Sequence, residues 1–289
     1  MNSKNDELTV YLPGRHFPSV SVTGQGCDLM CDHCRGAHLK NMIAVGSESC
    51  TPSPNNEDAS DEMLRIVDDV VALGGEGFLV SGGCDENGRV PVMRAAGMIR
   101  YAASKGLKAN VHTGFISRED AASLVRAGVN VFSTDIHQDP AIIGNVLHLD
   151  VAPEAYGDML DNIISAGGTV KPHITAGFGA ANAALSAELI KSKGLKEVIL
   201  LALVPTKGTI TENVLISEDA VLGTLRTLID AGLSVTLGCM RPRAHRELEI
   251  KCIEAGVRKI VSPSRNTVMW AEGKGFRIVE KRTCCSIIH

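Results

Sequence analysis

The chain has 289 residues, of which 44% are hydrophobic and 21% are charged, and its formal net charge is −4. This length can bury a sizeable core without disulfide bonds, and the mild negative charge disfavours non-specific binding to nucleic acid, which requires a basic surface. No linker-like stretch divides the sequence, so we expect residues 1–289 to form a single domain.

The sequence predicts no targeting or membrane segment. It shows no basic stretch followed by a short apolar run at the start, and no apolar run of about 18 residues. The cytoplasm is therefore the expected compartment. The nine cysteines are odd in number and unevenly spaced, which does not match the disulfide framework of a secreted protein. Metal or redox chemistry is the better interpretation.

The first predicted strand covers 19–23, and the loop 24–38 after it holds Cys27, Cys31 and Cys34 in the spacing C-x3-C-x2-C. A structural zinc site and a ferredoxin cluster each normally use four protein ligands. Three cysteines would instead leave one iron of a [4Fe–4S] cluster open to an external ligand. The alternative is a zinc site that a distant residue completes.

Further along the chain, helical patterns repeatedly end in a glycine, and a β-prone run follows. These glycines are Gly74, Gly106, Gly128, Gly167, Gly194, Gly232 and Gly256. A glycine just past a helix end can adopt the left-handed conformation that caps the last carbonyl groups. The runs after them are rich in Val, Ile, Leu and Thr, as buried parallel strands are.

Amphipathic patterns fill the intervals between these strands. We expect helices over 60–70, 119–125, 181–190, 217–229 and 244–255. Seven strand–helix units after the first strand predict an α/β fold, a full or partial parallel (βα) TIM-type barrel, with a short C-terminal extension over about 267–289. The alternative is a doubly wound open sheet, but no Gly-x-Gly-x-x-Gly turn follows the first strand.

Polar residues gather where the predicted strands end. These ends read SGGCDE (81–86), HTG (112–114), DIHQD (135–139), HITAG (173–177), VPTKGT (204–209), CMRPR (239–243) and SPSR (262–265). In parallel barrels the carboxyl ends of the strands carry the chemistry. We therefore expect a site on this rim, beside the three-cysteine loop.

The three-cysteine loop after the first strand of a predicted (βα) barrel resembles that of the radical S-adenosylmethionine (SAM) superfamily, and the likeness covers most of the chain. The resemblance implies that Cys27, Cys31 and Cys34 hold a [4Fe–4S] cluster whose open iron binds the amino and carboxylate groups of SAM. Reductive cleavage of SAM would give a 5′-deoxyadenosyl radical that abstracts a substrate hydrogen. A barrel interior closed by loops would shield such a radical.

The resemblance also implies contacts to SAM. His33 stands where an aromatic residue near the adenine is usual. Gly82 and Gly83 match the glycine motif that contacts the SAM amino group, because glycine lets a ligand approach the main chain closely. Cys84 replaces the acid that often follows this motif, and Asp85 comes next. The alternative for the two glycines is a plain turn.

Three further residues are candidates for binding SAM. His112 and Thr113 end one predicted strand and could reach the ribose or the carboxylate, and Asp135 ends the next. Asp135 and His137 could also place the substrate or conduct protons. The alternatives are a hydrogen-bonded structural histidine at 112 and an ion pair on the rim at 135 and 137.

The remaining cysteines suggest a second [4Fe–4S] cluster, which sulfur-inserting members of the superfamily use as a sulfur donor. Its candidate ligands are Cys239, Cys284 and Cys285, together with Ser264, Arg241 or Arg243. Cys252 lies within a predicted helix and is interpreted as a buried small side chain, and Cys50 as a bystander in a polar loop.

Within the superfamily, the segment VTGQGCDLMCDHCRGAHLKNM (22–42) resembles biotin-synthase-like proteins that include the two subunits of the split lipoyl synthase. That resemblance implies sulfur insertion into a protein-bound octanoyl group. The expected partners are a paired radical SAM subunit, an octanoylated lipoyl-carrier protein and a ferredoxin-type electron donor. The cysteine-rich N-terminal motif of single-chain lipoyl synthase is absent, as is the C-x-N-x-x-R strand motif of biotin synthase.

Two other functions are compatible with the residues. A radical SAM enzyme with one cluster could carry out other C–H activation or methylation. A carrier of an iron–sulfur cluster or of zinc would use the cysteines without SAM chemistry.

Overall fold

The computed structural model describes residues 7–46, 49–50, 59–245 and 247–287. The ends of the predicted 1–289 domain and of its C-terminal extension therefore lie outside the described residues. The strands are β1 (Glu7–Tyr11), β2 (Ser19–Ser21), β3 (Ile43–Ala44), β4 (Gly77–Ser81), β5 (Lys108–His112), β6 (Val129–Asp135), β7 (Val170–Ala176), β8 (Glu197–Ala202), β9 (Ser234–Leu237), β10 (Lys259–Val261) and β11 (Arg277–Lys281). The α-helices are α1 (Asp61–Ala72), α2 (Ala96–Ser104), α3 (Arg118–Ala127), α4 (Glu154–Ser165), α5 (Ala180–Ser192), α6 (Glu218–Asp230), α7 (Leu248–Glu254) and α8 (Arg265–Gly273).

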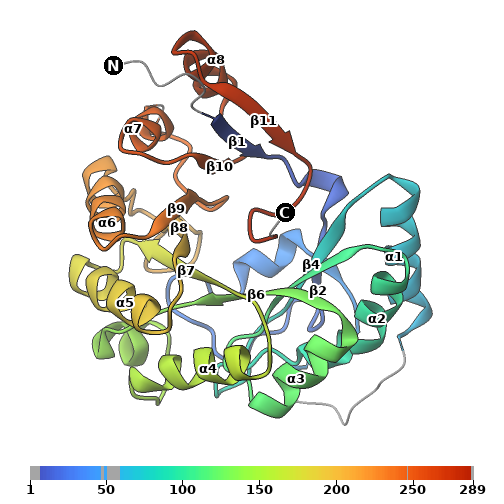
Figure 1. Ribbon diagram of the computed structural model, residues 1–289. Coiled ribbons are helices and arrows are strands. Elements are labelled where there is room, and N and C mark those ends of the chain that lie inside the picture. The colour runs from blue at the N-terminus through green and yellow to red at the C-terminus, as the bar shows by residue number, and fades with distance from the viewer. Residues whose placement is uncertain (1–6, 47–48, 51–58, 246, 288–289) are drawn as a thin grey trace.

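The strands form one parallel sheet in the order β11-β1-β10-β9-β8-β7-β6-β5-β4-β2-β3. The sheet curls into an open barrel, and the helices cover its outer, convex face (Figure 1). The predicted (βα) TIM-type barrel is therefore confirmed in its partial form. The doubly wound alternative is wrong, because that fold needs helices on both faces of the sheet.

The seven glycines that mark helix ends have the predicted conformation. Each has a positive φ, from 63° at Gly74 to 114° at Gly256, and each precedes one of the strands β4 to β10. Side-chain caps start several of the helices, as when the Ser60 hydroxyl accepts a hydrogen bond from the Met63 amide. None of the helices in the described part of the chain is long and apolar enough to cross a membrane.

The strand that precedes the cysteine loop is the second strand of the chain, not the first. β1 comes earlier and pairs with β10 and β11 near one edge of the sheet, whereas β2 pairs with β3 and β4 near the other edge. Residues 12–18 therefore cross from one edge to the other. The prediction missed β1 because its partners lie about 250 and 270 residues further along the chain, as in the pair Thr9 and Lys259.

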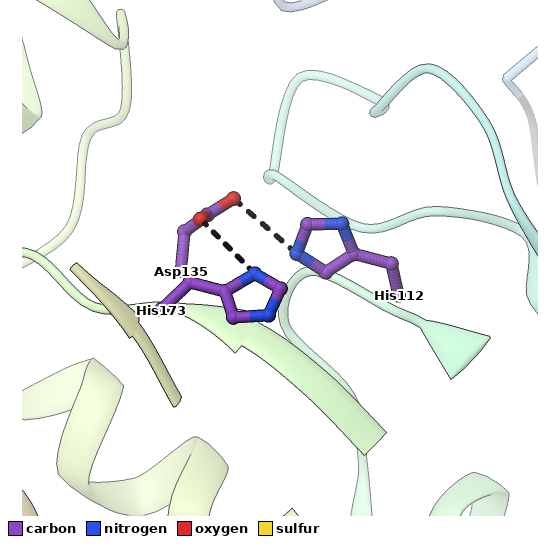
Figure 2. A group of neighbouring side chains, drawn as sticks. All are labelled: His112, Asp135 and His173. Carbon is purple, nitrogen blue, oxygen red and sulfur yellow. Dashed lines mark ion pairs between the residues drawn. The ribbon is translucent and has the colours of Figure 1, made fainter. Parts of the chain in front are cut away.

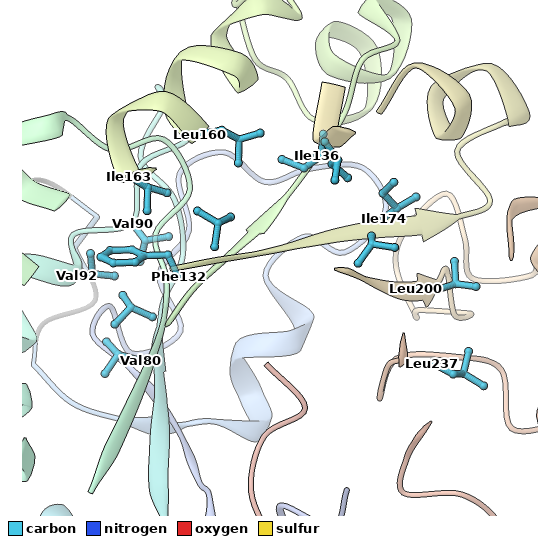
Figure 3. Close-up of a cluster of buried hydrophobic side chains, with 14 of the residues drawn as sticks. Val80, Val90, Val92, Phe132, Ile136, Leu160, Ile163, Ile174, Leu200 and Leu237 are labelled. Atoms are coloured by element: carbon cyan, nitrogen blue, oxygen red, sulfur yellow. The ribbon is translucent and has the colours of Figure 1, made fainter. Parts of the chain in front are cut away.

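The apolar core lies between the sheet and its helices. Phe132 of β6 and Ile163 of α4 are fully buried there, with neighbouring strands contributing Val80, Ile174 and Leu200 (Figure 3). Because strand side chains alternate between faces, the positions between these residues point to the concave side. Burial of the helices against the convex face therefore leaves the concave face free for polar groups.

The concave face is polar and receives the C-terminal segment 283–287. The Ser133 hydroxyl donates to the Ser286 hydroxyl at 3.0 Å, and the Asn110 amide donates to Cys284 Sγ at 3.5 Å. Ile287 is buried and packs with Phe17. Figure 1 shows this red segment turning into the space that the sheet encloses. The extension thus contains most of α8, adds β11 to the sheet and then fills part of the space that the sheet encloses.

Replacing Phe132 with Ala should lower the free energy of unfolding by about 3–5 kcal/mol, because it removes a fully buried aromatic ring and leaves a cavity under α4. Chemical denaturation followed by circular dichroism measures the change. Leu185→Ala is the control, since Leu185 is 46% exposed and should cost less than about 1 kcal/mol. Equal losses in the two variants would contradict the position of the core.

Candidate functional site

The cysteine loop 24–38 is fixed to the end of β4 by backbone contacts. The Gly83 amide donates to the Thr23 hydroxyl at 2.7 Å, and the Asp28 amide donates to the Cys84 carbonyl at 2.9 Å. A Cβ atom at Gly83 would lie only 2.6 Å from the Cα and Cβ atoms of Cys27 and would overlap the Gly26 carbonyl oxygen. The glycine at 83 is therefore required for the loop to approach the strand this closely.

The three cysteines of the loop are free thiols in different surroundings. Cys31 is buried, and its thiol donates to the Leu147 carbonyl at 3.5 Å, whereas Cys27 and Cys34 are partly exposed. Hydrogen bonding between the Cys31 and Cys34 thiols lowers the pKa of Cys34 to about 4 and raises that of Cys31, and His33 adds to the decrease at Cys34. Cysteine binds metal as the thiolate, and three cysteines on one loop supply sulfur donors of the kind that an iron–sulfur cluster requires.

A segment after β6 also supports the loop. The Asp32 amide donates to the Val146 carbonyl at 2.8 Å, at the end of a π-helical turn over Ile142–Val146. The His148 ring lies 3.1 Å from the Leu29 carbonyl through Nδ1 and 3.3 Å from the Asp32 carboxylate through Nε2. His148 has a left-handed backbone, with φ of 59°. The sequence carries no motif that indicates this histidine.

An array of aromatic rings extends from the loop towards β6. The His33 ring meets the edge of Phe178 with centroids 5.4 Å apart, and Phe178 meets His137 at 5.1 Å. His137 in turn lies 5.9 Å from Tyr156. Burial lowers the pKa of His137 to about 4, so this ring is neutral near pH 7. Phe178, His137 and Tyr156 are buried, so most of this array is shielded from solvent.

Three polar side chains meet on the concave face, where His112 ends β5, Asp135 ends β6 and His173 lies within β7. His112 Nε2 lies 3.3 Å from one carboxylate oxygen of Asp135, and His173 Nδ1 lies 3.8 Å from the other (Figure 2). Burial alone would lower the pKa of His112. The charge of the Asp135 carboxylate and its hydrogen bond to the ring have a larger, opposite effect, so the pKa of His112 is raised. Burial lowers the pKa of His173 to about 4. The structure thus joins His173, which the sequence only marks as part of a strand end, to two predicted residues.

Thr113 follows His112 directly in the chain. Its side chain is buried, and its hydroxyl donates to the Gly114 carbonyl at 2.7 Å. The hydroxyl is thus already satisfied by the turn that follows β5. This contact gives Thr113 a structural role within the turn.

Cys84 and Tyr156 interact electrostatically with both the cysteine loop and the histidine–aspartate group. Burial raises the pKa of the Cys84 thiol, and the charges of both Cys27 and Asp135 add to the increase. The pKa of Tyr156 is raised in the same way by burial, with contributions from Asp135 and Cys31. Cys84 and Tyr156 therefore lie close to both groups. Sequence reasoning did not single out Tyr156.

Cys239, Cys284 and Cys285 approach one another on the concave side. A hydrogen bond from Cys285 lowers the pKa of Cys284 to about 6. Cys239 is exposed, at the end of β9, and lies close enough for its charge to interact with the other two. In the described part of the chain these thiols are not close enough together to chelate a single ion. Ligands of a cluster bind different irons and can be further apart.

The arginines and the serine predicted near these cysteines are engaged elsewhere. Arg241 and Arg243 donate to the same oxygen of Glu249, at 3.1 Å and 3.0 Å. The Ser264 amide donates to the other oxygen at 2.7 Å, and the Ser264 hydroxyl caps α8 by accepting from the Thr267 amide. Arg241 is only 3% exposed. This network braces the loops after β9 and β10 and leaves these side chains little freedom to bind a cluster.

The two remaining cysteines have contrasting positions. Cys252 is fully buried within α7, as its helical pattern predicts. Cys50 is also buried, at 1% exposure, and lies near Asp28 and Cys27 of the cysteine loop. The polar sequence around Cys50 did not indicate this proximity.

Comparison with known proteins shows which solved structures share this fold. No family model matches the sequence, and a search of curated proteins finds no similar sequence. Among solved structures, methylornithine synthase (PylB) matches with a TM-score of 0.63 and 12% identity, over 94% of this chain and 84% of that chain.

Two further structures extend the comparison. HydG, a maturase of the [FeFe]-hydrogenase, matches with a TM-score of 0.62 and 13% identity, over 91% of this chain and 58% of that chain. Streptococcus suis SuiB, bound to its precursor peptide SuiA, matches with a TM-score of 0.54 and 11% identity, over 89% of this chain and 52% of that chain. The chain thus spans little more than half the length of these two proteins. At such identities the matches show a shared fold.

Replacing Gly83 with Ala should displace the cysteine loop, because the added methyl group would overlap the backbone of Gly26 and Cys27. The sequence predicts that the wild type binds iron after anaerobic reconstitution, and we expect the folded variant to retain less than half as much, measured as iron per chain. The matched control is Gly223→Ala on α6, where a Cβ would meet nothing within 4 Å. Full iron binding by the Gly83 variant would contradict this packing.

Proposed function

We propose that the protein is a radical SAM enzyme, in which Cys27, Cys31 and Cys34 hold a [4Fe–4S] cluster. The observation that carries this proposal is the backbone packing of a three-cysteine loop against the glycine-rich end of a barrel strand, seen at Gly83. Three thiolates leave one iron without a protein ligand. When bound there, the cluster supplies the electron for reductive cleavage of SAM. The fold shared with PylB and HydG supports the same proposal.

The residues around the loop have roles that follow from their surroundings. Burial of Cys31 keeps water from one thiolate, and His148 fixes the loop backbone through its contact with the Leu29 carbonyl. The Nδ1 atom of His33 is buried without a hydrogen-bond partner in the described part of the chain. This nitrogen is thus available to a ligand, and the sequence resemblance assigns the His33 ring to the adenine of SAM. The Gly83 amide already donates a hydrogen bond to the Thr23 hydroxyl, so the role of Gly83 is to let the loop approach the strand closely.

The substrate would bind on the concave face, between the loop and the strand ends. The neutral ring of His137, with Phe178 and Tyr156, would exclude water from a reactive intermediate there. The carboxylate of Asp135 could accept a hydrogen bond from a bound hydroxyl or amine, because 43% of its side chain is accessible. This arrangement binds, orients and shields, while a bound cofactor would supply the reactivity.

Sulfur insertion is the reaction that we propose, as one subunit of a two-protein lipoyl synthase. Its support is the approach of Cys239 to Cys284 and Cys285 on the same concave face, together with the sequence resemblance in 22–42. A second cluster held there could donate sulfur. The partners of this reaction would be a paired radical SAM subunit, an octanoylated carrier protein and a ferredoxin-type electron donor.

A single-cluster enzyme is the second candidate. It is favoured by the engagement of Arg241 and Arg243 with Glu249, which removes two candidate ligands of a second cluster. Such an enzyme would still cleave SAM but would catalyse other C–H activation or methylation.

Cleavage of SAM is the direct test of the class. The reconstituted protein, reduced with dithionite under anaerobic conditions, should release 5′-deoxyadenosine from SAM, measured by liquid chromatography. Cys31→Ala should abolish the product, because it removes a cluster ligand, whereas Cys252→Ala in α7 should retain it. A wild-type protein that binds iron but yields no 5′-deoxyadenosine would favour a cluster carrier instead.

Iron content separates the two candidate reactions. A protein with two [4Fe–4S] clusters should bind about eight irons per chain, and one with a single cluster about four. We expect about eight for the wild type and about four for the double variant Cys239→Ala/Cys285→Ala. Cys252→Ala is again the control. A wild type that stops at about four irons would rule out the second cluster and favour the single-cluster enzyme.

A further inference from the structure

Three side chains from neighbouring strands converge on the concave face of the sheet. His112 ends β5, Asp135 ends β6 and His173 lies within β7, where strand pairing sets it beside Asp135. Figure 2 shows both imidazole rings next to the carboxylate. One donor atom from each residue lies within 4.8 Å of the other two. Three hydrogen-bonded strands therefore hold these donors in place, as a preorganised site requires.

The spacing of the donors suits a single metal ion. Zinc binds histidine nitrogen and carboxylate oxygen at about 2.0–2.2 Å, so tetrahedral ligand atoms lie about 3.4 Å apart. His112 Nε2 is 3.3 Å from one oxygen of Asp135, and His173 Nδ1 is 3.8 Å from the other. Small side-chain rotations would bring one atom of each residue to bonding distance from a common centre.

The surroundings of His173 are not those of an ordinary ion pair. Both of its ring nitrogens are buried and have no hydrogen-bond partner among the described residues. The 3.8 Å that separates Nδ1 from Asp135 is too long for a hydrogen bond. A buried polar atom without a partner destabilises the fold. A metal ion bound at Nδ1 would remove this cost for the nitrogen that faces Asp135.

We propose that His112, Asp135 and His173 bind one divalent transition-metal ion of the zinc or iron(II) type. Two histidines and one carboxylate are typical ligands of these ions, and three protein ligands leave at least one position open. The Asp135 side chain is 43% accessible, so a ligand from solution can approach this carboxylate. A substrate that offers an oxygen, nitrogen or sulfur donor can complete the coordination.

This site is chemically distinct from the cysteine loop. Its ligands are nitrogen and oxygen atoms, whereas the loop offers only sulfur. The proposal therefore does not rest on SAM cleavage. It assigns His112 and Asp135 to a metal ion, where the sequence resemblance assigned them to SAM.

Cobalt(II) binding to the full chain tests the site. The protein carries Cys27→Ser, Cys31→Ser and Cys34→Ser together with Cys239→Ser, Cys284→Ser and Cys285→Ser, so that neither group of thiols can compete for the ion, and cobalt is titrated anaerobically. We expect one equivalent to bind, with visible d–d bands of nitrogen and oxygen ligation and without sulfur-to-cobalt charge transfer. Zinc should displace it. His173→Gln and, separately, Asp135→Asn should weaken binding by at least about tenfold.

The matched control is His245→Gln, which changes a histidine that contacts the Ile216 carbonyl outside the ligand set and should leave the affinity unchanged. Far-ultraviolet circular dichroism checks that each variant is folded. The proposal is overturned if no cobalt binds at stoichiometric concentrations, if the spectrum shows sulfur ligation, or if the folded His173 and Asp135 variants both bind as tightly as their parent. These readouts need no SAM, so a failure to cleave SAM would not affect them.

Discussion

The close approach between the end of β4 and the cysteine loop is the contact on which the candidate site depends. At Gly83 the strand backbone is so near Cys27 that a side chain cannot be accommodated, and the Thr23 hydroxyl ties the two segments together. A second support comes from the segment that contains His148. Backbone contacts on two sides can keep the loop in place before any cofactor binds, so the cysteines are positioned by the fold itself.

The division of the sheet into two faces makes room for this arrangement. Apolar side chains such as Phe132 and Leu200 bury the helices against the convex face, where most of the hydrophobic stabilisation arises. The concave face can then carry groups that are costly to bury, including Lys171 and Asp135. The C-terminal segment fills part of that space through the contact of Ser286 with Ser133. Stability and chemistry thus depend on opposite faces of the same strands.

Much of the fold follows from local sequence signals. Each of the seven glycines precedes a strand because the left-handed conformation they adopt ends a helix in a way that few other residues can. Contacts between distant segments carry no such signal. The pairing of β1 with β10 and β11 and the support of the loop by His148 join segments far apart in the sequence. The approach of His173 to Asp135 depends on the register between β6 and β7. The cysteine loop was evident only because its spacing is itself a chemical motif.

Electron paramagnetic resonance of the reduced, anaerobically reconstituted protein addresses the central claim most directly. If three cysteines leave one iron without a protein ligand, addition of SAM should change the g values of the [4Fe–4S] signal, because SAM would then bind that iron. The same change should be absent when 5′-deoxyadenosine, which lacks the amino and carboxylate groups of SAM, is added at equal concentration. A cluster signal that is identical with and without SAM, or a loop that binds zinc and gives no cluster signal, would contradict the account.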